Sequence, residues 1–115
     1  MSRFLVEASN DRWSALWRLA ATPGLRRGEL IGVGWSDLDI ERQELTVRRN
    51  VTVVNHAVHV GPPKNGRSRT LRIDPGTIAV LREWRRRQAE ELILLGEHRP
   101  EHDFAFTWQD GNVVH

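Results

Sequence analysis

The 115-residue sequence contains no cysteine, no tyrosine and a single lysine, Lys64. The absence of cysteine excludes disulfides, thiol nucleophiles and thiolate metal sites. The absence of tyrosine excludes a phenolic acid, base or nucleophile among these residues. Long apolar runs are also missing, so the sequence predicts neither a membrane span nor a signal peptide. We therefore expect a cytoplasmic protein with no membrane partner.

The charges are nearly balanced, with a formal net charge of +2, but they are unevenly distributed. Residues 64–87 contain eight Lys and Arg residues and two acids, whereas residues 88–115 contain one Arg and six acids. A basic segment is typical of a surface that attracts a phosphate backbone. It is equally typical of a solvated helix face. With 39% hydrophobic residues, the chain otherwise has the composition of one globular domain.

Apolar spacing predicts helices in the first third of the chain. Residues 2–8 are expected to form a helical stub, and Asn10 or Asp11 to cap a second helix. The apolar stripe of this second helix follows the i, i+3, i+4, i+7 pattern and consists of Trp13, Leu16, Trp17 and Ala20. A Thr-Pro-Gly break follows, and a short helix is expected over residues 26–33.

The apolar period then changes to two, which is typical of half-buried strands. One strand is expected over residues 45–53 and a second over residues 58–60. A hairpin at Asn65-Gly66 leads to a third strand over residues 70–73. These strands predict a three-stranded antiparallel meander.

The last part of the chain begins with a strong helix signal. Asp74 is a cap and Pro75 fits the first helical position, so a helix is expected to run to about residue 95 and to stop at Gly96. Residues 104–108 are expected to be extended. The predicted fold class is therefore α+β and mainly helical.

A Gly-Leu-Arg-Arg-Gly-Glu stretch over residues 24–29 is the strongest candidate for chemistry. Its arginines, Arg26 and Arg27, stand near a helix start, where the macrodipole favours anions and disfavours cations. Unpaired helix N–H groups and a guanidinium together make a good phosphate clamp. Glu29 is spaced to orient the Arg26 guanidinium. The alternative is a surface turn with an intrahelical ion pair.

The predicted hairpin tip is a second candidate site, because Lys64 stands there beside Arg67 and Arg69. Arginine is effectively always protonated, whereas lysine can release its proton and serve as a general acid. The stretch lacks the pattern of a phosphate-binding P-loop. The alternative is a solvated hairpin tip.

Other candidates favour structure over chemistry. The pairs His56/His59 and His98/His102 lack a suitable third ligand, so the sequence predicts no metal site and no cofactor. Asp37 and Asp39 alternate in a loop, which they are expected to cap. The tryptophans of the predicted helices fit core stripes better than base-stacking platforms.

Taken together, three stretches resemble the catalytic domain of phage integrases and other tyrosine recombinases. They are Ala21–Leu30 (A-T-P-G-L-R-R-G-E-L), Gly32–Asp39 (G-V-G-W-S-D-L-D) and Pro62–Lys64 leading to Arg69–Leu71. The segment 104–115 is similar to another segment of that family. Pro23 and Gly34 depart from the residues that are common there.

The resemblance implies a mechanism. Arg26 would hold the scissile phosphate and stabilise its transition-state charge. Lys64 would donate a proton to the leaving 5′-oxygen, and Glu29 would support the active site. Arg27, Arg67 and Arg69 would contact double-stranded DNA. In the family a tyrosine forms a 3′-phosphotyrosyl intermediate, without a metal and without a small-molecule substrate.

The H-x-x-R pair and the tyrosine of the family would follow the position of His115, and its further DNA-binding domains would precede Met1. We therefore expect residues 1–115 to be one partial catalytic domain, inactive alone in DNA integration. The missing part would leave apolar surface exposed, which favours self-association. Two alternatives remain, a non-catalytic DNA-binding or regulatory module and a remnant without function.

Overall fold

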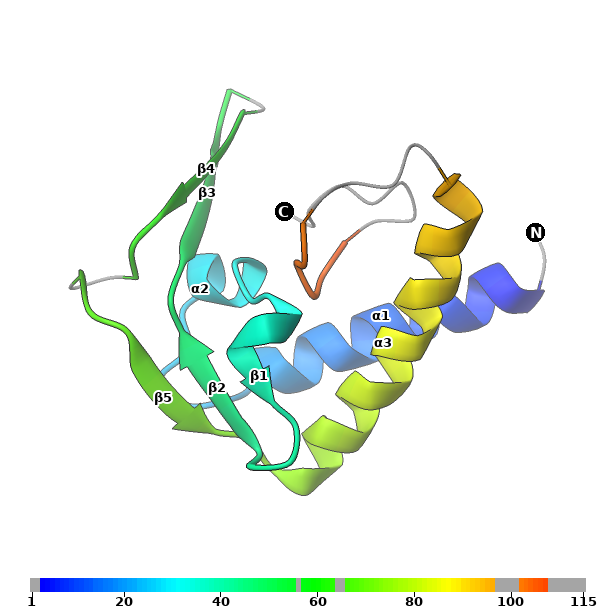
Figure 1. Ribbon diagram of the computed structural model, residues 1–115, viewed down its shortest axis with the longest axis horizontal. Coiled ribbons are helices and arrows are strands. Elements are labelled where there is room, and N and C mark those ends of the chain that lie inside the picture. Colours follow the sequence, from blue (N-terminus) through cyan, green and yellow to red (C-terminus); the bar gives the residue numbers. More distant parts are fainter. Residues whose placement is uncertain (1–2, 56, 64–65, 97–101, 108–115) are drawn as a thin grey trace.

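A computed structural model describes residues 3–55, 57–63, 66–96 and 102–107 (Figure 1). In chain order the elements are α1 (Arg3–Ala20), α2 (Arg27–Ile31), the short 3-10 helix η1 (Trp35–Asp37), β1 (Leu38–Asp39), β2 (Glu44–Val47), β3 (Asn50–Val54), β4 (Ala57–Gly61), β5 (Arg69–Arg72) and α3 (Pro75–Leu95). This α+β architecture, with an antiparallel three-stranded sheet, confirms the predicted fold class.

The strands of the sheet are not those that alternation predicts. The sheet has the order β1-β2-β5, whereas β3 and β4 pair only with each other and project from the rest of the molecule as a two-stranded ribbon (Figure 1). The expected single strand over residues 45–53 is therefore wrong, and so is a hairpin that pairs β4 with β5. The physical reason is Arg49, which stands in phase with Leu45 and Val47. Arg49 lies between β2 and β3, and its guanidinium binds Asp37 at 3.0 Å and Asp103 at 3.5 Å.

Helix α1 is continuous, so the expected stub over residues 2–8 and the cap at Asn10 or Asp11 are wrong. Asp11 lies within the helix, and its carboxylate accepts a hydrogen bond from Arg87 Nε of α3 at 3.0 Å. The buried face consists of Arg12, Ala15, Leu16 and Leu19. Trp17 is 68% exposed, so its place in the apolar stripe is also wrong. The pattern misses this face because it contains Arg12, whose charge is neutralised by Glu91 of α3.

Helix α3 follows the prediction from its first residue to its last. The Asp74 carboxylate accepts the Thr77 N–H at 3.0 Å, and Gly96 ends the helix with φ of 54°. The Asp74 cap receives hydrogen bonds from the Thr77 hydroxyl and N–H, which lower the pKa of this carboxyl. The inward face of α3 includes Ile78, Leu81 and Trp84, all of them buried.

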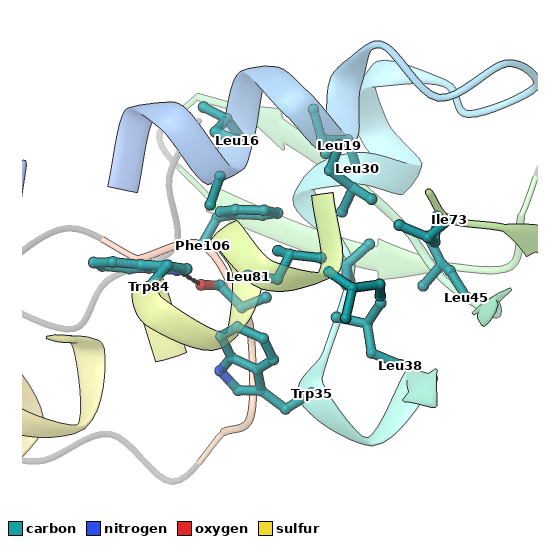
Figure 2. Close-up of a cluster of buried hydrophobic side chains, with 14 of the residues drawn as sticks. Leu16, Leu19, Leu30, Trp35, Leu38, Leu45, Ile73, Leu81, Trp84 and Phe106 are labelled. Carbon is teal, nitrogen blue, oxygen red and sulfur yellow. Dashed lines mark hydrogen bonds between the residues drawn. The ribbon is translucent and has the colours of Figure 1, made fainter. Parts of the chain in front are cut away.

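One hydrophobic core joins the two long helices to the sheet. Figure 2 shows Leu16 and Leu19 of α1 meeting Leu81 and Trp84 of α3, with Phe106 beside them. The Trp84 indole N–H donates to the Ala105 carbonyl at 2.6 Å. Burying a tryptophan with its N–H satisfied stabilises a core without a polar penalty.

Ala105 and Phe106 lie in this core, whereas Phe104 packs with Ile31 and Val51 in a second, smaller cluster. Gly34 and Phe104 form an isolated antiparallel bridge, and the Ala105 N–H donates to the Val33 carbonyl at 2.8 Å. The expected extension to Trp108 lies outside the described residues. Backbone pairing with residues 33–35 therefore fixes the described part of this segment.

Candidate phosphate-binding site

The site begins at the turn between α1 and α2. Gly24 has φ of +86°, a left-handed backbone conformation that residues other than glycine rarely adopt. The chain then becomes extended at Arg26, with φ of −91° and ψ of 156°, directly before α2 begins. Its carbonyl accepts the Leu30 N–H at 2.8 Å. Arg26 and Arg27 are both exposed, and neither forms an ion pair with any described residue.

Beneath this turn, Glu29 is only 1% exposed. Its Oε1 atom accepts the backbone N–H of Arg26 at 3.1 Å. The same carboxylate accepts two hydrogen bonds from the Arg69 guanidinium, Nη1 to Oε2 at 2.9 Å and Nη2 to Oε1 at 2.6 Å. Arg69 Nη2 also donates to the Gly24 carbonyl. The hydrogen bonds that the Arg69 guanidinium donates to Glu29 raise the pKa of Arg69 above its ordinary value.

Helix α2 lies close to β3, and Gly28 makes this close approach possible. A Cβ atom on Gly28 would lie 2.0 Å from Asn50 Oδ1 and 3.0 Å from the Val51 carbonyl oxygen. Glycine at this position permits the short helix to lie against the strand. Arg27, the residue before Gly28, is exposed to solvent. Glu29, the residue after it, is buried.

The Gly-Trp-Ser-Asp segment is organised by two carboxylates. Asp37 is buried, accepts the Gly34 N–H at 3.1 Å and forms an ion pair with Arg48 at 3.2 Å. Asp103 accepts the Ser36 N–H at 3.1 Å and the Ser36 hydroxyl at 2.6 Å. These hydrogen bonds from Ser36, assisted by Arg49, lower the pKa of Asp103.

The role predicted for Asp37 and Asp39 as loop caps is confirmed. Asp39 Oδ1 accepts the Arg42 N–H at 3.0 Å, as Asp37 accepts that of Gly34. Their carboxylates therefore stabilise the loops on either side of β1. Asp103 and Arg49, which complete this network, were not singled out from the sequence, since no pattern links residues so far apart.

A second buried network joins α1, α3 and residues 104–107. Arg12 and Glu91 form an ion pair, and Arg12 Nε donates to the Thr107 carbonyl at 2.6 Å. The Arg12 guanidinium also lies 4.7 Å from the centre of the Trp84 ring. Burial raises the pKa of Glu91, whose Oε2 atom has no hydrogen-bond partner among the described residues.

Gln88 extends this network toward η1. Its Oε1 atom accepts the Trp35 indole N–H at 2.6 Å, and its Nε2 atom donates to the Phe104 carbonyl at 3.0 Å. A buried amide that satisfies groups on two segments fixes them relative to each other. Neither Gln88 nor Arg12 stands out in the sequence, because both occupy positions where a helix pattern expects apolar residues.

The structure thus brings three of the sequence-predicted residues, Arg26, Glu29 and Arg69, to one turn. The expectation that Glu29 orients the Arg26 guanidinium is wrong, because the Glu29 carboxylate binds the Arg26 backbone N–H and the Arg69 guanidinium instead. Arg67 is exposed and forms no ion pair with a described residue, whereas Lys64 lies outside the described residues. The described residues contain no group of three His, Cys, Asp or Glu side chains that could hold a metal ion. None of the helices in the described residues has both the length and the apolar character that a membrane span requires.

Known proteins similar to this chain include a tyrosine recombinase and a prophage integrase, although no protein-family model matches the chain. A "Tyrosine recombinase XerC-like" protein of Caldanaerobacter subterraneus is 34% identical over 116 residues, which cover 90% of this chain and 30% of that protein. "Prophage integrase IntR" of Escherichia coli K12 is 34% identical over 96 residues, covering 83% of this chain and 21% of the relative. The chain therefore spans about a third or less of the length of these relatives.

Solved structures show the same fold. The Tn1549 transposon integrase, in complex with a circular intermediate DNA, superposes with a TM-score of 0.68 at 18% identity, covering 91% of this chain and 33% of that one. The XerA recombinase gives a TM-score of 0.60 at 21% identity, covering 100% of this chain and 37% of the other. Identities this low are evidence for the fold alone.

Proposed function

Because the chain is a homologue of the tyrosine recombinases and integrases, we propose that it is part of a site-specific DNA recombinase of the integrase type and that it binds double-stranded DNA. The identity of 34% across 90% of the chain is the observation that carries this proposal. Residues 1–115 would form part of a catalytic domain. In a bacterial cell the protein would act in the cytoplasm, on DNA of the nucleoid.

Arg26 is the proposed phosphate clamp. Its guanidinium is exposed at the start of α2 and forms no ion pair with a described residue, so it is available to an incoming phosphate. A guanidinium binds two phosphate oxygens at once and retains its charge at every physiological pH. Such a fixed cation stabilises the charge that develops as a phosphoryl group is transferred. This chemistry requires no metal ion.

Lys64 is the proposed general acid. Its ammonium can give a proton to a leaving oxygen, a step that arginine performs poorly because its pKa is too high. Lys64 precedes Arg69 by five positions, and Arg69 lies at the Arg26 turn. Arg27 and Arg67, both exposed, would add contacts to the DNA backbone.

The nucleophile would come from outside these residues. A 3′-phosphotyrosyl bond requires a tyrosine, and the 115 residues contain none. We therefore expect the chain alone to bind DNA without cleaving it. A nicked duplex, on which a recombinase becomes trapped as a covalent adduct, should yield no adduct with this chain, and recovery of one would contradict the proposal.

DNA binding tests the proposed function. Fluorescence anisotropy with a short labelled duplex should show an affinity that falls steeply as salt rises, since phosphate contacts release counterions. Arg26→Ala should weaken binding about tenfold and lower the salt slope by about one. Arg42→Ala is the matched control, because this exposed arginine in the turn after β1 already pairs with Asp39.

The alternative of a non-catalytic DNA-binding module makes the same binding prediction but gives no special weight to Arg26. Equal losses for Arg26→Ala and Arg42→Ala would favour it. Absence of salt-dependent binding would exclude both and leave a remnant without function.

A further inference from the structure

The family resemblance implies that Arg69 contacts DNA, but its guanidinium is already engaged. Nη1 and Nη2 bind the two oxygens of Glu29, and Nη2 also binds the Gly24 carbonyl. The Arg69 side chain is 34% exposed and the Glu29 side chain 0%. A phosphate would have to compete with a buried carboxylate for the same donors.

The partners of Arg69 belong to a part of the chain 40 and 45 residues away. Glu29 and Gly24 lie on either side of Arg26, and Glu29 also binds the Arg26 backbone N–H. Arg69 itself is the first residue of β5 and follows Lys64 and Arg67 in the sequence. Its guanidinium therefore joins the Arg26 turn to the start of β5.

We propose that Arg69 is a positioning residue, which fixes the Arg26 turn relative to the start of β5 and does not itself bind phosphate. This inference rests on the proposed function, because it assigns Arg69 a role in the same site. A buried carboxylate is stable only when paired and hydrogen-bonded. The bidentate geometry supplies both conditions, and it also sets the direction of the guanidinium.

The substitution Arg69→Lys separates positioning from phosphate binding. Lysine keeps the positive charge and remains a good point-charge partner for phosphate, but it lacks the planar fork that spans both oxygens of Glu29 and the Gly24 carbonyl. Arg69→Lys should therefore weaken DNA binding several-fold, nearly as much as Arg69→Ala. If Arg69→Lys kept the wild-type affinity while Arg69→Ala lost it, the proposal would be overturned.

An NMR measurement without DNA keeps the test independent of the proposed function. In Arg69→Lys, backbone amide resonances of residues 24–29 and of Gly66 and Arg67 should shift together. Arg67→Ala, a neighbouring exposed arginine, should leave residues 24–29 unchanged. Unchanged amide resonances at residues 24–29 in Arg69→Lys would contradict the positioning role of Arg69. Shifts at residues 24–29 together with those at Gly66 and Arg67, in a chain that fails to bind DNA, would support that positioning role and refute the recombinase function.

Discussion

Asp103 shows, at the scale of single residues, how one carboxylate connects distant parts of the chain. It accepts two hydrogen bonds from Ser36, and Arg49 lies 3.5 Å from it. These donors hold the pKa of Asp103 below the ordinary value of 3.8. A carboxyl with a lowered pKa in the folded state adds stability above that ordinary value and loses this contribution as the pH falls through the folded-state pKa.

Replacement of Asp103 should therefore change the pH dependence of unfolding. Asp103→Asn is expected to be less stable than the wild type at neutral pH, and the difference should shrink as the pH falls below about 3.8. Urea unfolding across this range measures it. A gap that is constant with pH would show that the charge of Asp103 contributes nothing.

Sequence reasoning singled out residues whose signals are local. Arg26 and Glu29 were found because a Pro-Gly break followed by two arginines is informative within ten positions. The Arg69–Glu29 pair spans 40 positions and the Arg12–Glu91 pair spans 79, so no periodicity links their members. Arg69 was therefore predicted to contact DNA, whereas in the structure its guanidinium binds Glu29.

At the scale of elements, predictions held where the end signals were strong. Helix α3 begins at Pro75, directly after its cap Asp74, and ends before Gly96, as expected. The strands were less predictable, because alternation continues across Arg49 although the chain there leaves one sheet for another. Helix α1 was divided wrongly, since Asn10 and Asp11 resemble a cap when the packing against α3 is unknown.

The contact between α2 and β3 makes a prediction at this scale. Gly28→Ala should reduce the free energy of unfolding by about 1–3 kcal/mol, because the added Cβ atom would force Asn50 and the Val51 carbonyl to move. Gly61→Ala is the matched control in β4, where a Cβ atom would meet nothing within 4 Å. Thermal unfolding compares the two variants. Equal melting temperatures would mean that α2 does not need this close approach.

At the scale of the whole molecule, the surface carries large apolar side chains. Trp17 is 68% exposed, Ile93 71% and Leu94 74%. We propose that this exposure favours association with a second copy at high concentration. Light scattering should show a mass that rises with concentration and a smaller rise for Leu94→Lys than for Ala79→Lys, an exposed control on the same helix. A constant monomer mass would contradict it.

DNA is proposed to bind at the Arg26 turn, so an NMR titration of the ¹⁵N-labelled chain with duplex DNA locates the contact surface. Amide shifts should concentrate at residues 24–29 and 66–69, around Arg26 and the start of β5, and should be lost in high salt. Shifts confined to the exposed face of α3, with residues 24–29 unaffected, would contradict it.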